Sequence, residues 1–245
     1  MSTKEKLSRR RFLSGAAVAG AATIIPRHVL GAPGEPSANE KLNIAGVGVG
    51  GMGSGDVRRV PTENIVAICD VDANHAANAA KPFPGAKIYD DFRKMLDAEK
   101  DIDAVMVATP DHNHAQVTMA ALRMGKHVFC QKPLTHSVHE ALEVAKAAKE
   151  AGVATQMGNQ GQASEGARLT CEYIAAGAIG QVREIHSWSN RQPDISPRGV
   201  PRPSDTPPVP DGLNWDLWLG PAPERPYHPT YLPFRWRGWW DFGTG

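Results

Sequence analysis

Residues 42–53, with the sequence LNIAGVGVGGMG, restrict the fold of this chain more than any other segment. An apolar run that ends in clustered glycines is typical of a buried strand that turns sharply into a helix. In a G-x-G-x-x-G pattern the first glycine permits the turn, the second lets the backbone approach a pyrophosphate, and the third lets the helix pack on the strand. We assign these roles to Gly48, Gly50 and Gly53 rather than to the register that starts two residues earlier, because this choice leaves a strand of ordinary length.

The acid that would bind a ribose in this pattern is Asp70. It follows the next apolar run, residues 64–69, at about the 20-residue distance from the glycines that such an acid requires. A carboxylate accepts a hydrogen bond from a ribose 2′-hydroxyl and repels a 2′-phosphate, so Asp70 favours NAD over NADP. Gly51 and Met52 open the helix, whose unpaired N–H groups would face the phosphates.

Strand and helix patterns alternate through residue 158. We expect strands at 42–47, 64–69, 87–89, 104–108, 127–130 and 153–157, and helices at 51–60, 73–81, 92–96, 113–124 and from the capping box at Ser137 to Ala151. This alternation favours an α/β fold with a doubly wound parallel sheet, so residues 38–158 are predicted to form a Rossmann dinucleotide-binding domain.

The pattern changes after Gly158. A helix at 165–176 and a strand at 182–188 are expected, followed by a proline-rich loop at 192–210 and a tryptophan-rich stretch at 215–240. One helix and one strand cannot bury a core of their own, so we expect residues 159–245 to be the start of an incomplete C-terminal α/β domain. The aromatic stretch could stack on a sugar, pack internally or contact a subunit, and Arg235, Trp236 and Arg237 are weak candidates for substrate contacts.

The first 37 residues are predicted to be a twin-arginine signal peptide and linker. Arg9 and Arg10 stand before an apolar, Ala- and Gly-rich stretch that is too short for a stable membrane anchor. Such a leader sends folded proteins through the Tat export machinery, which predicts a periplasmic protein that binds its dinucleotide before export.

Charge and cysteine content exclude several classes of function. The net charge of +1 gives no argument for nucleic acid, and six of the 27 lysine and arginine residues precede residue 33, so the body of the chain is mildly acidic. An anionic cofactor must therefore be held by local dipoles rather than by a basic field. The three cysteines lack the spacing of metal ligands, and no metal site is expected.

Two clusters follow the ends of neighbouring strands, where open parallel sheets bind ligands. Thr109 and Pro110 lie in the first, and Lys132 lies in the second, where Pro133 holds it extended. A lysine beside a bound dinucleotide could move a hydroxyl proton as hydride leaves carbon, although a solvated loop lysine fits the position equally well. His114 opens a helix, where capping or packing is at least as plausible as catalysis, and His112 is expected to face solvent.

These motifs together resemble the Gfo/Idh/MocA oxidoreductases. The resemblance rests on the glycine run, Asp70, Thr109-Pro110 with His114, and GKHVFCQKP at residues 125–133, and it covers about residues 41–245. It implies a Rossmann domain, a mixed α/β domain on a large open sheet, tightly held NAD or NADP, and oxidation or reduction of sugars and polyols. It also implies that Lys132 relays a proton. The predicted cofactor-binding residues are Gly48, Gly50, Gly51, Met52, Gly53, Asp70, Thr109, Pro110, His114, Gln131 and Lys132, with Lys132 and His114 as the catalytic candidates.

Two departures from the family pattern stand out. Gln131 occupies the place of the usual glutamate, and a neutral amide cannot hold Lys132 charged as a carboxylate would. The family's second catalytic element, a histidine with a nearby aspartate, would lie beyond Gly245, so we expect this chain to be inactive alone. We also expect the full-length form to be a homo-oligomer.

The sequence therefore predicts an exported, NAD-dependent oxidoreductase acting on a sugar or polyol. Two alternatives belong to other classes. One is a glycoside hydrolase that uses bound NAD for transient oxidation, which would release sugar without accumulating NADH. The other is a non-catalytic dinucleotide-binding protein. Resemblance of fold does not name the substrate.

Overall fold

The computed structural model describes residues 40–188 and 199–244. The arginine pair and the rest of the predicted leader lie outside the described residues. Internal contacts divide the chain into two units, Met1–Lys41 and Leu42–Gly245. The domain boundary at residue 158 stays a prediction.

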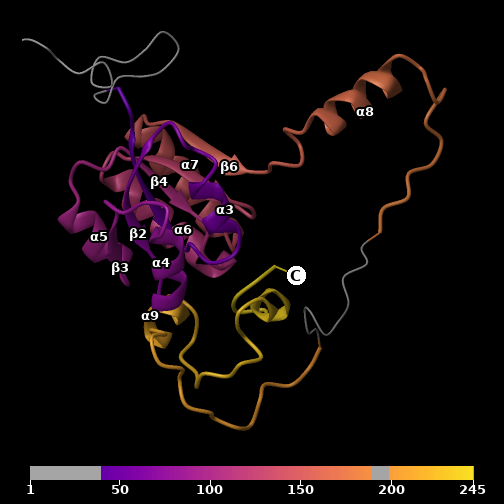
Figure 1. The fold of residues 1–245 in the computed structure, drawn as a ribbon. Helices are drawn as coiled ribbons and strands as arrows, with labels where there is room; N and C mark the ends of the chain where they lie inside the picture. The colour runs from indigo at the N-terminus through magenta and orange to yellow at the C-terminus, as the bar shows by residue number, and fades with distance from the viewer. Residues whose placement is uncertain (1–39, 189–198, 245) are drawn as a thin grey trace, which may run out of the picture. The chain divides into compact units, whose positions relative to one another are not determined.

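One parallel sheet of six strands forms the centre of this unit (Figure 1). The strands are β1 (Asn43–Val47), β2 (Asn64–Cys69), β3 (Lys87–Tyr89), β4 (Ala104–Val107), β5 (His127–Gln131) and β6 (Thr155–Gly158). Their order, β3-β2-β1-β4-β5-β6, reverses direction between β1 and β4. That reversal is the topological switch point at which doubly wound sheets bind ligands.

Helices cover both faces of the sheet. On one face, α3 (Met52–Val57) and α4 (Ala73–Ala80) bury Val57, Ala76 and Ala79 against the strands. On the other face, α5 (Phe92–Ala98), α6 (Asp111–Arg123) and α7 (Val138–Ala151) supply a second and larger core. The predicted α/β fold with a doubly wound parallel sheet is confirmed, because buried apolar runs such as Ala104–Val107 need cover on both faces.

Local signals placed the helix ends well. Ser137 and Glu140 form the predicted capping box of α7, and Gly152 ends the helix in the left-handed conformation. The helix α3 is shorter than predicted: it ends at Val57 rather than at residue 60.

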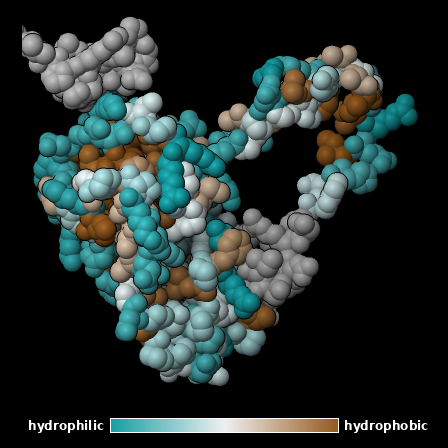
Figure 2. Space-filling model, viewed as in Figure 1, coloured by the Kyte–Doolittle hydropathy of each residue, from teal (hydrophilic) through white to brown (hydrophobic). Residues whose placement is uncertain are grey.

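The segment after β6 differs from its prediction. The helix α8 (Glu165–Ala175) forms as expected but buries none of its residues, and Figure 2 shows hydrophobic side chains on its surface. Residues 182–188 were expected to be a strand, and this is wrong: they form no regular secondary structure and are exposed. A strand requires a hydrogen-bonded neighbour, and the sheet of the described residues ends at β6.

Aromatic side chains from the C-terminal part pack into a third core. The helix α9 (Trp215–Leu219) and the 3₁₀ helix η1 (Arg235–Gly238) contribute Trp218 and Trp236, and Phe242 is fully buried among them. Internal packing is thus one role of the tryptophan-rich stretch. Within residues 40–188 and 199–244, no helix is long and apolar enough to cross a membrane.

The third core rests on His112 of α6, which is 2% exposed. The expectation that His112 faces solvent is therefore wrong. Its ring nitrogens lie 3.2 Å from the carbonyl oxygen of Phe242 and 3.0 Å from that of Trp218. A neutral imidazole has one N–H, so we place it on Nδ1, donating to Phe242, while Nε2 can accept from the Asn113 amide at 3.2 Å.

We expect this contact to make the free energy of unfolding depend on pH. Burial lowers the pKa of His112 from 6.5 to about 4, so between these values the unfolded chain binds a proton that the folded chain does not. Stability should therefore be complete above about pH 6.5 and fall by about 3 kcal/mol as pH drops towards 4.

Urea unfolding followed by tryptophan fluorescence at several pH values measures this dependence. His112→Gln serves as the comparison, because it cannot titrate while His114 still can. If the variant loses as much stability on acidification as the unmodified protein, the dependence does not come from His112.

Candidate functional site

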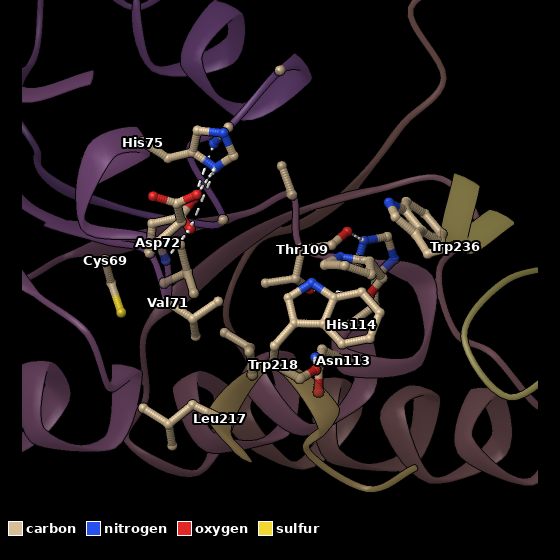
Figure 3. A pocket seen from close by; sticks show the side chains of 18 of the residues that line it. Cys69, Val71, Asp72, His75, Thr109, Asn113, His114, Leu217, Trp218 and Trp236 are labelled. Carbon is tan, nitrogen blue, oxygen red and sulfur yellow. Dashed lines mark hydrogen bonds and ion pairs between the residues drawn. The ribbon is translucent and has the colours of Figure 1, made fainter. Parts of the chain in front are cut away.

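A cavity of about 510 Å³ lies at the carboxyl ends of the strands (Figure 3). Every predicted cofactor residue except Gly53 lines it. The C-terminal segment closes one side, where Leu217, Trp218 and Trp236 face the cavity. The fold thus brings together residues that lie more than 80 positions apart in the sequence, at the place where ligands of such sheets bind.

The glycine turn between β1 and α3 is built for close backbone approach. Gly48 has a φ of +76°, and a Cβ there would lie 2.6 Å from the backbone nitrogen of Thr109. A Cβ on Gly53 would collide with the carbonyl oxygen of Gly48, so α3 can lie this close to the turn only with glycine at that position. Gly51, with a φ of +53°, has open space around its missing side chain. This geometry matches the turn and packing roles assigned to Gly48 and Gly53, and leaves an open cradle that fits a dinucleotide phosphate.

Asp70 is held directly beside this turn. Its Oδ2 accepts a hydrogen bond from the N–H of Gly50 at 3.0 Å, and its Oδ1 accepts one from the N–H of Asp72 at 3.0 Å. These two bonds fix the carboxylate at the cavity wall, where Asp70 also lines a second cavity of about 600 Å³. The position suits a ribose hydroxyl that donates to the remaining lone pairs.

His114 connects the ends of β4 and β5. It is buried, and its Nδ1 and Nε2 lie 2.6 Å from the carbonyl oxygen of Pro133 and 2.8 Å from that of Thr109. Burial lowers the pKa of His114 against the opposing pull of these two carbonyls. His114 thus lies between the two predicted clusters, and a neutral ring donates to one of the two carbonyls at a time.

A buried polar pair lies behind Lys132. Gln131 donates from Nε2 to Oδ2 of Asp56 at 2.6 Å, and these residues are only 5% and 3% exposed. The Oε1 of Gln131 accepts from the backbone N–H of Lys132 at 3.3 Å. Lys132 itself is exposed and lines the cavity. A carboxylate is therefore present behind the lysine, but α3 supplies it rather than β5.

The three weak substrate candidates separate. Trp236 and Arg237 line the cavity, and the Arg237 guanidinium lies 4.2 Å from the centre of the Trp236 ring. Arg235 is exposed and is not among the lining residues. All of these site assignments stay predictions, because lining the cavity does not by itself establish contact with a cofactor or substrate.

Sequence reasoning missed two residues at this site, Asp56 and His75. Asp56 is buried beside Gln131, and His75 of α4 lies against Asp70 and Asp72 (Figure 3). Neither has a spacing that marks it, since both reach the site only through the fold. Among the described residues, no group of three or more His, Cys, Asp or Glu side chains could hold a metal ion.

Comparison with known families gives two matches on consecutive parts of the chain. The model of the Gfo/Idh/MocA oxidoreductase family for its NAD-binding Rossmann fold matches residues 42–159. The model of the C-terminal α/β domain of the same family matches residues 202–245. The two matches together include the glycine turn, both strand-end clusters and the aromatic core.

Curated relatives are about a third identical to this chain over the aligned residues. An inositol 2-dehydrogenase of Rubrobacter xylanophilus is 31% identical over 164 residues, which are 65% of this chain and 46% of the relative. A 2,7-anhydro-N-acetylneuraminate hydratase of Escherichia coli is 31% identical over 163 residues, which are 63% of this chain and 42% of the relative. The chain thus spans less than half the length of these relatives.

Solved structures share the fold as well. A levoglucosan dehydrogenase in complex with NADH superposes with a TM-score of 0.51 at 30% identity, over 58% of this chain and 41% of that one. The chain therefore belongs to the Gfo/Idh/MocA family of NAD-binding oxidoreductases.

Proposed function

We propose that this protein is an NAD-dependent oxidoreductase that transfers hydride between a bound nicotinamide and a sugar or polyol. The observation that carries the proposal is that the glycine turn, Asp70 and Lys132 all line one cavity. The relatives named for inositol and levoglucosan support a substrate with several hydroxyl groups. The test is a screen of sugars and polyols for NADH formation by near-ultraviolet absorbance.

The residues for holding the dinucleotide are those of the glycine turn and Asp70. The turn offers glycine backbone with open space at Gly51, and Asp70 offers a carboxylate for the ribose. The nicotinamide, when bound, would supply the hydride acceptor or donor. Gly48 and Gly53 keep the turn compact, and His114 keeps the ends of β4 and β5 together.

Lys132 is the residue for the proton. Oxidation of an alcohol removes a hydride from carbon and a proton from oxygen, and Lys132 would take that proton or return it in the reverse direction. Its side chain is exposed at the cavity, and its backbone is anchored through Gln131 to Asp56. His114 contacts only backbone carbonyls among the hydrogen bonds described above, so we assign it a positioning role.

A second candidate, cleavage or addition without net oxidation, is favoured by one observation. The relative from Escherichia coli is named as a hydratase, and a hydratase reaction involves no net oxidation or reduction. A glycoside hydrolase that oxidises its substrate transiently would use the same cavity. Release of free sugar without NADH accumulation would favour this alternative, whereas stoichiometric NADH favours the dehydrogenase.

We expect the protein to bind NAD more tightly than NADP because of Asp70. Asp70→Asn keeps the shape of the side chain but removes the charge, so NAD affinity should fall about tenfold and the preference over NADP should shrink. Calorimetric titration with each dinucleotide measures both constants. Asp97→Asn, an exposed acid in α5, is the matched control. Tighter binding of NADP by the unmodified protein would refute the assignment of Asp70.

We also propose that the protein is exported to the periplasm by the Tat machinery. Replacing Arg9 and Arg10 by lysine should leave the folded precursor in the cytoplasm, because the machinery reads the arginine pair rather than its charge. Fractionation followed by immunoblotting measures the distribution. Arg27→Lys is the control, since it changes an arginine of the same segment outside the pair. Normal export of the double variant would contradict the proposal.

A further inference from the structure

The side chain of His75 lies between two carboxylates at the end of β2. Its Nδ1 is 3.8 Å from Oδ1 of Asp70 and 3.9 Å from Oδ2 of Asp72, as the dashed lines in Figure 3 mark. Asp72 caps α4 by accepting from the N–H of Asn74, which places His75 in the first turn of the helix and directs its ring towards Asp70. The ring is therefore held by the start of α4 at the acid that is proposed to bind the ribose.

The same ring covers the glycine turn. A Cβ on Gly50 would lie 2.7 Å from Nδ1 of His75, and the N–H of Gly50 donates to Asp70. The side chain of His75 is 40% exposed and lines the cavity. A molecule bound to the turn and to Asp70 at once would thus contact His75.

His75 is the basic group of a strongly acidic neighbourhood. The β2–α4 connection presents Asp70 and Asp72 to the cavity, the loop after β3 presents Asp90 and Asp91, and the first turn of α6 presents Asp111. The C-terminal segment adds Leu213 there, which carries no charge. The other basic lining residues, His114, Lys132 and Arg237, come from α6, the end of β5 and η1. The contact with Asp70 is the main cause that raises the pKa of His75, and the charge of Asp72 adds to it against the opposing effect of burial. At 3.8 Å the attraction to Asp70 is mostly between charges.

We propose that His75 selects between cofactors by its charge: the neutral ring restricts the site to NAD, and the protonated ring admits the 2′-phosphate of NADP. This inference rests on the proposed function, since it concerns the dinucleotide that the site would hold. In this proposal the preference for NAD over NADP depends on His75 of α4 as well as on Asp70, which follows β2.

The electrostatics follow from the two carboxylates. With His75 neutral, Asp70 and Asp72 present two negative charges to a phosphate, and NADP is repelled. Protonation of His75 offsets one of these two charges and provides a further N–H donor for a phosphate oxygen. For charges several ångströms apart in a half-exposed site, this change corresponds to about a tenfold change in relative affinity.

The test measures the dissociation constants of NAD and NADP by calorimetry at about pH 8 and about pH 5.5, at one ionic strength, for three proteins. The ratio of the NADP constant to the NAD constant should fall about tenfold on acidification of the unmodified protein. His75→Gln should keep a high ratio at both pH values, and His75→Arg, with its permanent charge, should keep a low ratio at both. The 2′-phosphate of NADP also titrates in this range, so the change in His75→Gln gives the background from the ligand, and the effect of His75 is the excess change in the unmodified protein.

An unchanged ratio in the unmodified protein would overturn the role of His75, and so would an equal change in His75→Gln. NAD binding itself is the internal control for an intact site. If neither dinucleotide binds at either pH, the proposed function fails and this inference fails with it. If NAD binds but the ratio does not depend on residue 75, only this inference fails.

Discussion

Replacing Gln131 by glutamate is expected to lower the free energy of unfolding by about 2–4 kcal/mol at neutral pH, although glutamate is the usual residue of the family here. In this chain the Gln131 amide donates to Asp56 at 2.6 Å, and both side chains are almost completely buried. A glutamate would place two carboxylates at that distance away from water. One of them must then keep a proton, or the contact must break.

The loss of stability in Gln131→Glu should grow as pH rises. The folded variant would hold one proton that the unfolded chain releases above the ordinary carboxyl range, so its stability falls as pH rises. Chemical unfolding at about pH 5.5 and about pH 8 should show a larger loss relative to the unmodified protein at the higher pH.

The matched control exchanges the two partners. In the double variant Asp56→Asn with Gln131→Glu, the asparagine amide can donate to the glutamate, which restores one carboxylate and one amide. The other oxygen of residue 56 can still accept from Gln160, whose amide lies 3.4 Å from it. We expect the double variant to regain most of the lost stability, with a coupling energy of about 2 kcal/mol. A glutamate variant as stable as the unmodified protein at about pH 8, or no rescue by Asp56→Asn, would refute this account.

Short-range signals were sufficient for the sheet and its turn. The residue pattern gave all six strands of the Rossmann unit within two residues. An unbroken hydrophobic run marks strands buried on both faces, such as Ala104–Val107, whereas most residues of β3 and β6 are exposed. The roles of Gly48 and Gly53 were also predictable, since each reflects a local backbone requirement. The position of the strand-end clusters at one cavity then follows from the parallel topology alone.

Contacts between distant segments could not be predicted in this way. His112 looks like a polar residue at the start of a helix, and only the packing of Trp218 and Phe242 against it explains its burial. The failure of the strand at 182–188 has the same origin, because a strand depends on a neighbour that the pattern of its own residues does not reveal.

Asp56 shows what such contacts change in the chemistry. The sequence alone indicates that the candidate catalytic residue Lys132 lacks a neighbouring carboxylate, because Gln131 stands where the family pattern has glutamate. In the structure, the carboxylate of Asp56 in α3 accepts a hydrogen bond from the side-chain amide of Gln131. Gln131 thus joins a carboxylate of α3 to the backbone N–H of Lys132 through its side-chain amide.

Lys132→Ala is expected to lower kcat of the protein by about two to four orders of magnitude. The side chain is exposed at the cavity, at the carboxyl end of β5, while the neighbouring Gln131 carries the buried contacts. Loss of a proton-transfer group removes an interaction made in the transition state, so kcat falls more than substrate affinity does. NAD affinity and the melting temperature should change little, because the exposed side chain adds little to the core.

Lys132→Arg separates proton transfer from charge. Arginine keeps the positive charge and most of the length but does not release its proton in proteins, so it should be nearly as inactive as alanine if the lysine moves a proton. If the lysine only supplies charge, the arginine variant should recover most of the activity. Lys149→Ala, in the last turn of α7, is the control for losing an exposed lysine elsewhere. Steady-state kinetics with the substrate found in the sugar and polyol screen measure all four proteins, and unmodified turnover by Lys132→Ala would remove this lysine from the mechanism.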